Sequence, residues 1–414
     1  MTAAGGPLTI DRDRFAADLH TMNRFGWTDR GLQRTAFSPA HAEVRAWFLQ
    51  RARDAGLRTA VDGAGNHSAA LPAERGNART LLVGSHLDSV PSGGRFDGAL
   101  GVLCALEVVR TAADAGLRLP VTLEAIDFTD EEGTVFPTLG SEALAGVLTP
   151  SALAAPACGR DVLLAALARA GLAEDGVLQA RREPATLAGF LELHIEQGPV
   201  LEREGIAIGI VTGICGQASL QIVFDGAARH AGTTPMDDRR DAGLGAAAFA
   251  LAVRETVVRD FPGCVATIGS MRLHPGASNV VPGRAELPLD CRSLDGEQLG
   301  ALSDALVSLA REQAERWGLD VRVTPAGLWP PEPTHERARA AIARSADALG
   351  LRAMEMPSGG GHDAQVLARV TTTGMVFVPS RAGIGHHPDE HTTLEQCIDG
   401  CNVLLGAALD LAAG

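Results

Sequence analysis

The sequence predicts an α/β protein with a mixed, mostly parallel sheet flanked by helices and an inserted α+β domain of the ferredoxin-like type. In the first half of the chain, short β-rich runs alternate with amphipathic helical stretches, which is the pattern of a parallel sheet covered by helices. After about residue 212 the pattern changes to a compact β-α-β-β-α-β unit. Alternation of β and α segments resumes after the prolines of "GLWPPEP" at 327–333.

The length of the chain also favours two domains. At 414 residues it is longer than one hydrophobic core normally supports. We therefore predict a larger, discontinuous domain over 1–212 and 331–414, with a small domain over 213–330 inserted into it. Catalytic clefts commonly lie between domains of this kind.

The elements of the larger domain follow in order. Its strands are expected at 80–87, 121–128, 188–195, 206–213 and 374–380. Its helices are expected at 99–115, over the alanine- and leucine-rich segment from about 141 to 180, and from about 392 onward. Each strand is short and apolar, as in a sheet that is buried on both faces.

The small domain has a different pattern. "ASLQIVFDG" at 218–226 alternates between apolar and polar residues, which indicates a strand with one buried face. Further strands are expected at 264–276 and 285–293, and helices at 239–258 and 295–318. One face of this small sheet should therefore be exposed.

Charge and cysteine content restrict the function. The net charge of −14 disfavours nucleic acid or an anionic membrane surface as a partner, so we expect a small-molecule ligand. The N-terminal segment lacks the apolar core of a signal peptide and no run could span a bilayer, which predicts a cytoplasmic protein. The seven cysteines are scattered without a Cys-x-x-Cys pair, so they should be reduced, and any metal should have nitrogen and oxygen ligands.

Four polar segments follow predicted strands, where an open α/β sheet places its ligand site. They are "SHLDSVPSGGRFDG" with His86, Asp88 and Asp97, "FTDEEGTVF" with Asp130, Glu131 and Glu132, "LELHIEQGP" with His194, and "GIGHHPDEHT" with His386, His387, Glu390 and His391. Each could be a solvated loop, an acidic turn or a structural histidine. Together they offer the imidazoles and carboxylates of a two-metal hydrolytic site, including a carboxylate able to bridge the ions and a free base.

At these residues the chain resembles the zinc-dependent amidohydrolases of the M20 peptidase-like superfamily. More narrowly, it is similar to the branch of N-carbamoyl-L-amino-acid hydrolases, β-ureidopropionases and allantoate amidohydrolases. The matching motifs are "GSHLDSVPSGGRFDGALGV", "DEEGTVFPTLGS", "HIEQGPVLE", "HAGTTPMDDRRDA", "SNVVPG" with "LDCR", "SGGGHDA" and "FVPSRAGIGHHPDE". They run in order from about residue 80 to 390, so the resemblance covers most of the chain.

The resemblance implies a di-zinc exopeptidase-like catalytic domain, a small domain that acts as lid and dimerisation domain, and two divalent metal ions. Zinc is the expected metal, with manganese, cobalt or nickel as alternatives. It implies that His86 and His194 bind one ion, that Glu132 and His386 bind the other, and that Asp97 bridges them. His386 is assigned by the Gly-Ile-x-His pattern, although His387 follows it directly.

The resemblance also implies catalytic and substrate-binding roles. Glu131 would be the general base, Asp88 would orient His86, and His230 would stabilise the oxyanion. Arg292 would grip the substrate carboxylate, and Arg239 matches the arginine after the "TTPM" turn. The residues implied in substrate binding are Gln197, His230, Asn279, Arg292 and Gly360.

The activity implied is hydrolysis of the ureido C–N bond of N-carbamoyl-L-amino acids, which yields amino acid, ammonia and carbon dioxide. A water bridging the metals would be activated by Glu131. N-carbamoyl-β-alanine and allantoate remain alternative substrates, since each carries a ureido group and a carboxylate. An M20-type aminopeptidase or dipeptidase and a non-catalytic metal- or ligand-binding relative are further alternatives. The resemblance alone implies a homodimer through the small domain.

Overall fold

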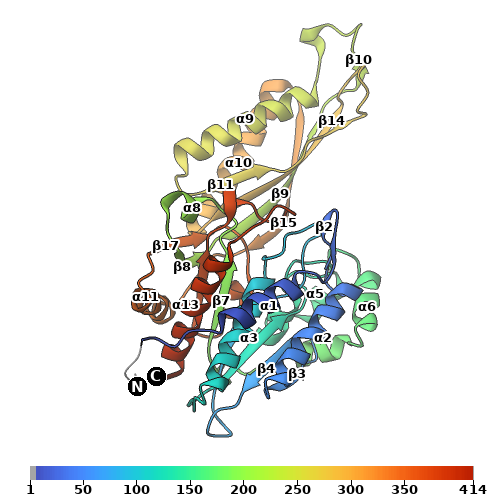
Figure 1. Cartoon of the computed structure of the whole chain (residues 1–414). Coiled ribbons are helices and arrows are strands. Elements are labelled where there is room, and N and C mark those ends of the chain that lie inside the picture. Colours follow the sequence, from blue (N-terminus) through green and yellow to red (C-terminus); the bar gives the residue numbers. More distant parts are fainter. Residues whose placement is uncertain (1–5, 414) are drawn as a thin grey trace. The chain divides into compact units, whose positions relative to one another are not determined.

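The protein folds into two compact units. The computed structural model describes residues 6–413. One unit comprises Met1–Thr212 with Pro333–Gly414, and the other comprises Gly213–Glu332 (Figure 1). The expected domain boundaries lay after residues 212 and 330, and the second division falls two residues later than expected.

The first unit, unit 1, is built on a nine-stranded sheet in the order β16-β8-β18-β7-β5-β6-β4-β3, with β17 paired to β8. Its centre consists of four parallel strands: β6 (Thr122–Phe128), β5 (Thr80–His86), β7 (Leu187–Ile195) and β18 (Thr373–Val378). Further strands extend it on both sides. On one side are β4 (His67–Leu71), antiparallel to β6, and β3 (Arg58–Val61), antiparallel to β4. On the other side are β8 (Ile208–Ile214), antiparallel to β18, and two strands that pair with β8, namely β16 (Glu332–Pro333) and β17 (Ala353–Ser358). The expected mixed, mostly parallel α/β sheet is confirmed.

Helices cover this sheet. The longest are α1 (Arg12–Met22), α2 (Pro39–Asp54), α3 (Ala99–Asp114), α11 (Glu336–Ala348) and α13 (Leu394–Ala413). Helix α3 is buried along nearly its whole length and packs on β5 and β6, while α13 packs on α3 and β7. The apolar strands and these helices share one core, which fixes the strand ends in space. A two-residue pair, β1 (Trp27–Thr28) and β2 (Gly31–Leu32), and the short helices α8 (Val200–Glu204) and α12 (Asp363–Leu367) complete the unit.

The segment expected to be helical from 141 to 180 is divided into four short helices. These are α4 (Leu139–Ala145), α5 (Pro150–Ala154), α6 (Arg160–Arg169) and α7 (Glu174–Gln179). Gly146, Gly159 and Gly171 adopt positive φ angles between them. Glycine in that conformation ends a helix, and proline begins α5, so the apolar residues form a small separate core instead of one long helix.

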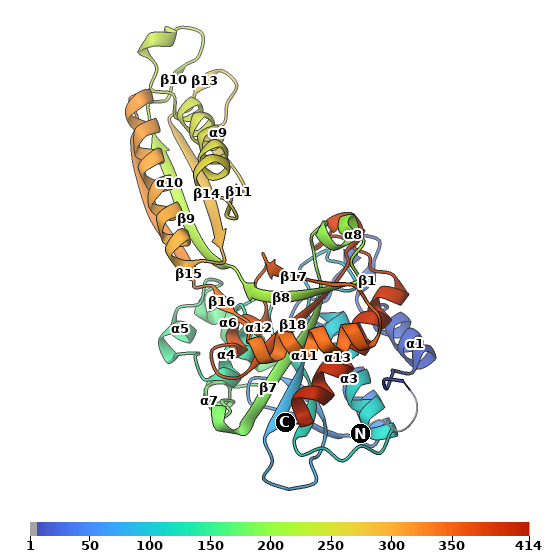
Figure 2. The same cartoon turned by 90° about the vertical axis from the view of Figure 1, so that its left-hand side faces the viewer.

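Unit 2 contains a five-stranded antiparallel sheet in the order β11-β14-β9-β15, with β12 paired to β14 (Figure 2). Its strands are β9 (Gly216–Asp225), β11 (Val265–Ile268), β12 (Arg272–His274), β14 (Arg284–Ser293) and β15 (Asp320–Trp329), and a separate pair joins β10 (Arg229–His230) to β13 (Val280–Val281). Helices α9 (Ala242–Asp260) and α10 (Gly296–Trp317) pack on the sheet. When β9, β11, β14 and β15 are numbered 1 to 4 along the chain, their order across the sheet is 2-3-1-4. This is the expected ferredoxin-like topology.

All seven cysteines are free thiols, and five of them are buried. No helix within residues 6–413 combines the length and the apolar character that crossing a membrane requires.

Candidate metal centre and active site

The four polar segments meet at one edge of the unit 1 sheet. His86 is the last residue of β5, the acidic turn follows β6, and His194 is the last residue but one of β7. His386 follows β18, beyond the short helix η3 (Arg381–Gly383). Because the four strands are parallel neighbours, their carboxyl ends lie at the same edge, where open α/β sheets bind ligands.

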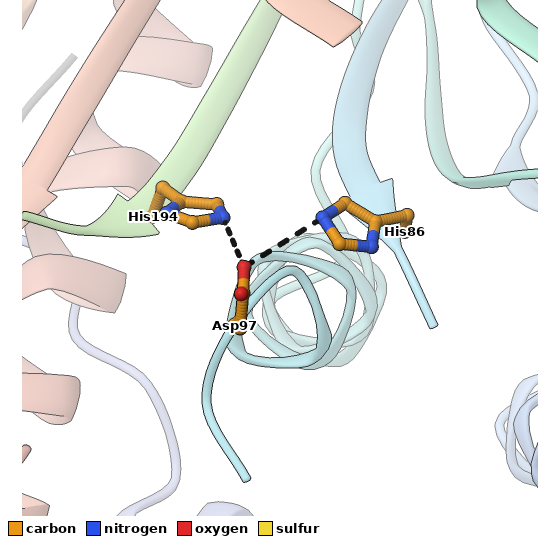
Figure 3. A group of neighbouring side chains, drawn as sticks. All are labelled: His86, Asp97 and His194. Carbon is orange, nitrogen blue, oxygen red and sulfur yellow. Dashed lines mark ion pairs between the residues drawn. The ribbon is translucent and has the colours of Figure 1, made fainter. Parts of the chain in front are cut away.

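Three buried side chains form the first group of possible metal ligands. The Nε2 atom of His194 lies 2.9 Å from Oδ1 of Asp97, and the Nε2 atom of His86 lies 3.9 Å from the same oxygen. Both rings point toward this carboxylate (Figure 3). Their ligand atoms all lie within 4.8 Å of one another, so a single cation could contact all three.

The second group shares Asp97 with the first. The other carboxylate oxygen of Asp97, Oδ2, lies 3.1 Å from Nε2 of His386, which is itself 3.7 Å from Oε2 of Glu132. Asp97 thus presents one oxygen to each group, as a carboxylate that bridges two ions does. His387 instead contacts Asp389, with Nδ1 3.7 Å from Oδ2, and of the two neighbouring histidines only His386 belongs to this group of described residues.

The donor set fits divalent cations. In His86 and His194 the Nδ1 atom faces a main-chain carbonyl, that of Asp88 at 3.1 Å and that of Ile195 at 2.9 Å. A carbonyl only accepts, so Nδ1 carries the proton and, in the neutral ring, Nε2 presents a lone pair. Both lone pairs face the Asp97 carboxylate, an arrangement that repels unless a cation or a proton lies between them.

Burial and charge set the ionisation of this cluster. Burial lowers the pKa of His86 to about 4. Burial alone would also lower the pKa of His194, but the hydrogen bond and charge of Asp97 raise it to about 9. Burial, followed by the charges of Asp363 and Glu132, raises the pKa of Glu131 well above its usual value. So many buried carboxylates favour the binding of positive charge.

Glu131 lies against the first group. Its Oε2 atom is 3.5 Å from Nε2 of His86, and its side chain is 10% exposed. Its neighbour Glu132 belongs to the second group, so consecutive side chains serve different purposes. A carboxylate beside a group that could hold a metal ion would be suited to accept a proton from water bound there.

The acidic turn is fixed by Asp130, a residue to which the sequence assigned no role. Asp130 has a positive φ of 57°, and its carboxylate accepts hydrogen bonds from the amides of Thr134, Val135 and Phe136. These bonds close the turn and hold the two glutamates that begin it. Three adjacent carboxylates are therefore tolerated because one of them binds backbone amides.

Asp88 acts on His86 through a different group from the expected one. We expected its carboxylate to accept the ring N–H, but the main-chain oxygen of Asp88 lies closer, at 3.1 Å against 3.8 Å for Oδ1. The carboxylate instead accepts the amide hydrogen of Glu132 at 3.2 Å. Asp88 is fully buried. Through these two hydrogen bonds it connects His86 of the first ligand group to Glu132 of the second.

The family model for peptidase family M20/M25/M40 matches residues 82–410 of the chain. The chain belongs to this family. An N-carbamoyl-L-amino acid amidohydrolase of Geobacillus stearothermophilus is 39% identical over 93% of this chain and 94% of its own. An allantoate deiminase of Arabidopsis thaliana is 33% identical over 92% of this chain and 79% of its own. A crystal structure of an amidase of the hydantoinase/carbamoylase family from Burkholderia multivorans has a TM-score of 0.90 at 35% identity, with 98% of this chain and 99% of that chain covered.

Two substrate-binding candidates of this M20 protein lie beside Asp97, the carboxylate that the two ligand groups share. Gln197, with a positive φ of 54°, donates from Nε2 to Oδ2 of Asp97 at 2.9 Å. Gly360 lies next to Gln197, since a Cβ atom at residue 360 would come within 3.7 Å of the Gln197 amide oxygen. Both are therefore in place to meet a molecule bound at the ligand groups.

The other candidates lie in unit 2, and they do not form one cluster there. His230 pairs with Val280 across β10 and β13, and Asn279 accepts the Ala231 amide with its main-chain oxygen. Arg239 donates to the carbonyls of Ala231 and Thr234 and so fixes the loop that begins at His230.

Arg292 lies toward the other end of β14, half-buried, with Nε donating to Asp290 at 2.8 Å. The loop that carries His230 and Asn279 lies beyond the first residue of β14, Arg284. Eight residues of strand, about 27 Å, separate Arg284 from Arg292. One small substrate cannot reach both ends of β14 in the same copy of unit 2.

Glu390, to which we assigned no role from the sequence, holds the loop that carries Asp97. Its Oε1 atom accepts the amides of Phe96 at 2.8 Å and Asp97 at 3.0 Å. Gly94 is required beside it, because a Cβ atom there would collide with the Glu390 carboxylate. In the sequence, Glu390 is distinguished only as a carboxylate four residues after His386. Nothing in the sequence shows which residues it contacts.

A second buried glutamate, Glu192, links three segments that lie next to the ligand groups. It accepts the Ser85 hydroxyl at 2.7 Å and the Ala364 amide at 2.8 Å, which joins β5 and β7 to the "SGGGHDA" segment. His362 of that segment packs against His194, with ring centroids 4.6 Å apart and the ring planes tilted by 59°. These contacts restrict the His194 ring, and only the folded chain reveals them.

Proposed function

We propose that this M20 protein hydrolyses the ureido C–N bond of N-carbamoyl-L-amino acids, giving the free amino acid, ammonia and carbon dioxide. The observation that carries the proposal is the pair of ligand groups that share Asp97, with Glu131 directly beside them. The similarity to an N-carbamoyl-L-amino acid amidohydrolase over 93% of the chain supports this bond type.

The first ligand group, with Asp97 as the shared carboxylate, would hold one divalent ion through His86 and His194. The second would hold another through Glu132 and His386. Ions bound there would polarise the scissile carbonyl and lower the pKa of the attacking water. Nitrogen and oxygen donors suit zinc, and manganese, cobalt or nickel would also bind them.

The chain's own residues perform the proton transfers. Glu131 takes a proton from the attacking water onto its carboxylate and then delivers it to the leaving nitrogen of the amino acid, whose bond to the carbamoyl carbon breaks. The carbamate that is left then splits into ammonia and carbon dioxide. Asp88 holds Glu132 and His86 in register during this exchange. Gln197, tied to Asp97, orients the bound ureido group.

Residues of unit 2 would bind the rest of the substrate. Arg292 offers a planar guanidinium for the α-carboxylate, and a fork of that kind gives more specificity than a lysine. His230 would meet the negative charge that develops on the carbonyl oxygen, with Asn279 beside it.

A homodimer would reconcile these roles. Because about 27 Å of β14 separates the two ends of unit 2, we propose that His230 and Asn279 serve the site of the other copy. Exposed apolar side chains on α9 support association through unit 2. Leu244, Leu251 and Val258 are spaced seven residues apart on one face, and the last two are 70% and 69% exposed.

Allantoate amidohydrolase or β-ureidopropionase activity is the second candidate, and the similarity to an allantoate deiminase favours the first of these. An M20 aminopeptidase or dipeptidase would use the same ligand groups on a peptide bond, and a non-catalytic relative would bind ligand without turnover. The presence of Glu131 beside the ligand groups favours an enzyme.

A substrate panel tests the proposal. The protein is stripped of metal, reloaded with zinc, manganese, cobalt or nickel, and supplied in turn with N-carbamoyl-L-amino acids, N-carbamoyl-β-alanine, allantoate and dipeptides. We expect ammonia release to be fastest from N-carbamoyl-L-amino acids and absent from the stripped protein. Faster cleavage of dipeptides than of every ureido compound would refute the proposal.

A further inference from the structure

A groove on unit 1 has no part in the metal centre. It has a volume of about 340 Å³ and lies along one face of α2, where residues of α6 and the start of β4 complete its walls. The basic residues that line it are His41, Arg45, Arg53, His67 and Arg169. No acidic side chain of the described residues lines it, although the chain carries a net charge of −14.

His41 brings an unused hydrogen-bond donor to this groove. The residue is 1% exposed, and its Nδ1 atom accepts the amide hydrogen of Phe37 at 3.2 Å. A ring nitrogen that accepts carries no proton, so in the neutral ring the proton is on Nε2. Burial lowers the pKa of His41 well below its usual value, which keeps the ring neutral.

The Nε2 atom of His41 is buried and has no hydrogen-bond partner within residues 6–413. A buried donor left without an acceptor destabilises the folded protein. A ligand oxygen in the groove would satisfy it.

The arginines of the groove differ in what they contact. Arg45 is engaged within the fold, with Nε 2.6 Å from Asp127 and Nη2 donating to the Phe128 carbonyl. Arg53 and Arg169 are exposed at the ends of α2 and α6, and neither has an ion-pair partner in the described part of the chain. Two unpaired guanidinium groups and a buried N–H suit an anion.

The remaining wall is apolar. Phe37, Ala42, Ala46 and Leu49 contribute it, and the last three follow the same face of α2 as the basic residues. Apolar surface of this kind favours a ligand with a hydrocarbon body over a bare inorganic ion.

We propose that this groove binds a small organic carboxylate, with the carboxylate accepting from His41, positive charge supplied by Arg53 and Arg169, and an apolar body along α2. The groove lies in unit 1 and uses none of the residues of the two ligand groups. The proposal therefore does not depend on the reaction proposed for the metal centre.

The test uses the full-length, metal-loaded protein and 3-phenylpropionate as the probe, with binding measured by titration calorimetry. The variant Arg53→Gln/Arg169→Gln removes both exposed charges without touching the core. Arg75→Gln is the matched control, because Arg75 is equally exposed but lies in the loop between β4 and β5 and does not line the groove. Arg292→Gln reports any binding at the candidate carboxylate site of unit 2.

We expect the double variant to bind 3-phenylpropionate about tenfold more weakly or worse, as loss of charge-assisted hydrogen bonds implies. Arg75→Gln and Arg292→Gln should bind as the unchanged protein does, and the neutral 3-phenylpropionamide should not bind. Absence of binding at roughly 10 mM probe, or loss of binding in Arg292→Gln alone, would overturn the proposal. Tighter binding of inorganic phosphate than of 3-phenylpropionate would show that the groove does not select an organic carboxylate.

Discussion

At the scale of single residues, the ligand groups depend on side chains that contact no ligand themselves. Glu390 accepts both amides that lead into Asp97, and that contact places the shared carboxylate between His194 and His386. Partners of this kind normally change metal affinity by 10–100-fold when they are removed.

We therefore expect Glu390→Ala to weaken metal binding by roughly 10–100-fold, because the two amides lose their acceptor and the Asp97 loop can move. Glu390→Gln keeps an acceptor oxygen and should lie between the alanine variant and the unchanged protein. Competition with a chromophoric chelator measures the affinity without reference to activity. Unchanged affinity in Glu390→Ala would show that the loop holds its position unaided.

His67 gives a pH dependence of stability that is separate from the metal centre. Burial lowers its pKa from 6.5 to about 3, and its Nδ1 atom bonds to the Gly65 carbonyl. Below pH 6.5 the unfolded chain takes up a proton that the folded chain does not, so the free energy of unfolding falls as the pH falls.

His67→Asn keeps a donor for Gly65 and removes this titration. Between pH 6 and pH 4 the stability of the variant should fall less steeply than that of the unchanged protein, by up to about 1.4 kcal/mol per pH unit. Urea unfolding at several pH values measures the difference. Parallel curves would mean that His67 is protonated in the folded protein.

The candidate ligand residues could be picked out from the sequence, because each lies at or after the end of a strand whose apolar run is easy to recognise. His86 and His194 are such cases. The contacts of Glu390 and Glu192 could not be predicted, since each joins segments far apart in the chain. The sequence likewise indicated Asp88 as the partner of His86 but could not show that its main-chain oxygen accepts the ring proton.

At the scale of elements, the junction between β5 and α3 decides whether the ligand groups form. Gly98 precedes α3 with φ 60° and ψ −50°, and a Cβ atom there would overlap the His86 ring. Glycine is needed both for its backbone angles and for the closeness of the ring.

Gly98→Ala should therefore displace His86 and remove metal binding at the first group. Gly116→Ala is a matched control at the other end of α3, because Gly116 has φ 62° but no atom within 4 Å of the added carbon. Both variants should lose about 1 kcal/mol or more from backbone strain. Only Gly98→Ala should lose metal, as measured by elemental analysis after gel filtration, and equal loss in both would point to strain alone.

Sequence patterns identified most elements but did not locate every helix boundary. The parallel strands were predicted as short apolar runs, and α3 as the longer helical stretch between two of them. The segment from 141 to 180 has the same composition as a long helix, yet Gly146, Gly159 and Gly171 divide it. Composition identified its helical character, and the turn residues set its boundaries.

At the scale of the whole molecule, the proposed dimer can be tested on α9. Leu251→Glu places a charge on the exposed apolar face of α9. We expect this variant to sediment as a monomer under conditions in which the unchanged protein is a dimer, with dissociation at least 100-fold more favourable. Leu164→Glu changes a leucine of α6 that is 37% exposed and should leave the assembly intact. A dimeric Leu251→Glu protein would place the interface elsewhere.

The proposed reaction depends above all on Glu131 acting as the base beside two bound metal ions. The most direct measurement is ammonia release from an N-carbamoyl-L-amino acid by Glu131→Gln and by the unchanged protein, each at its measured metal content. The glutamine variant should retain its metal and lose activity by roughly 100- to 10,000-fold, because an amide cannot accept the proton. Activity near that of the unchanged protein, with the metal retained, would show that Glu131 is not the catalytic base.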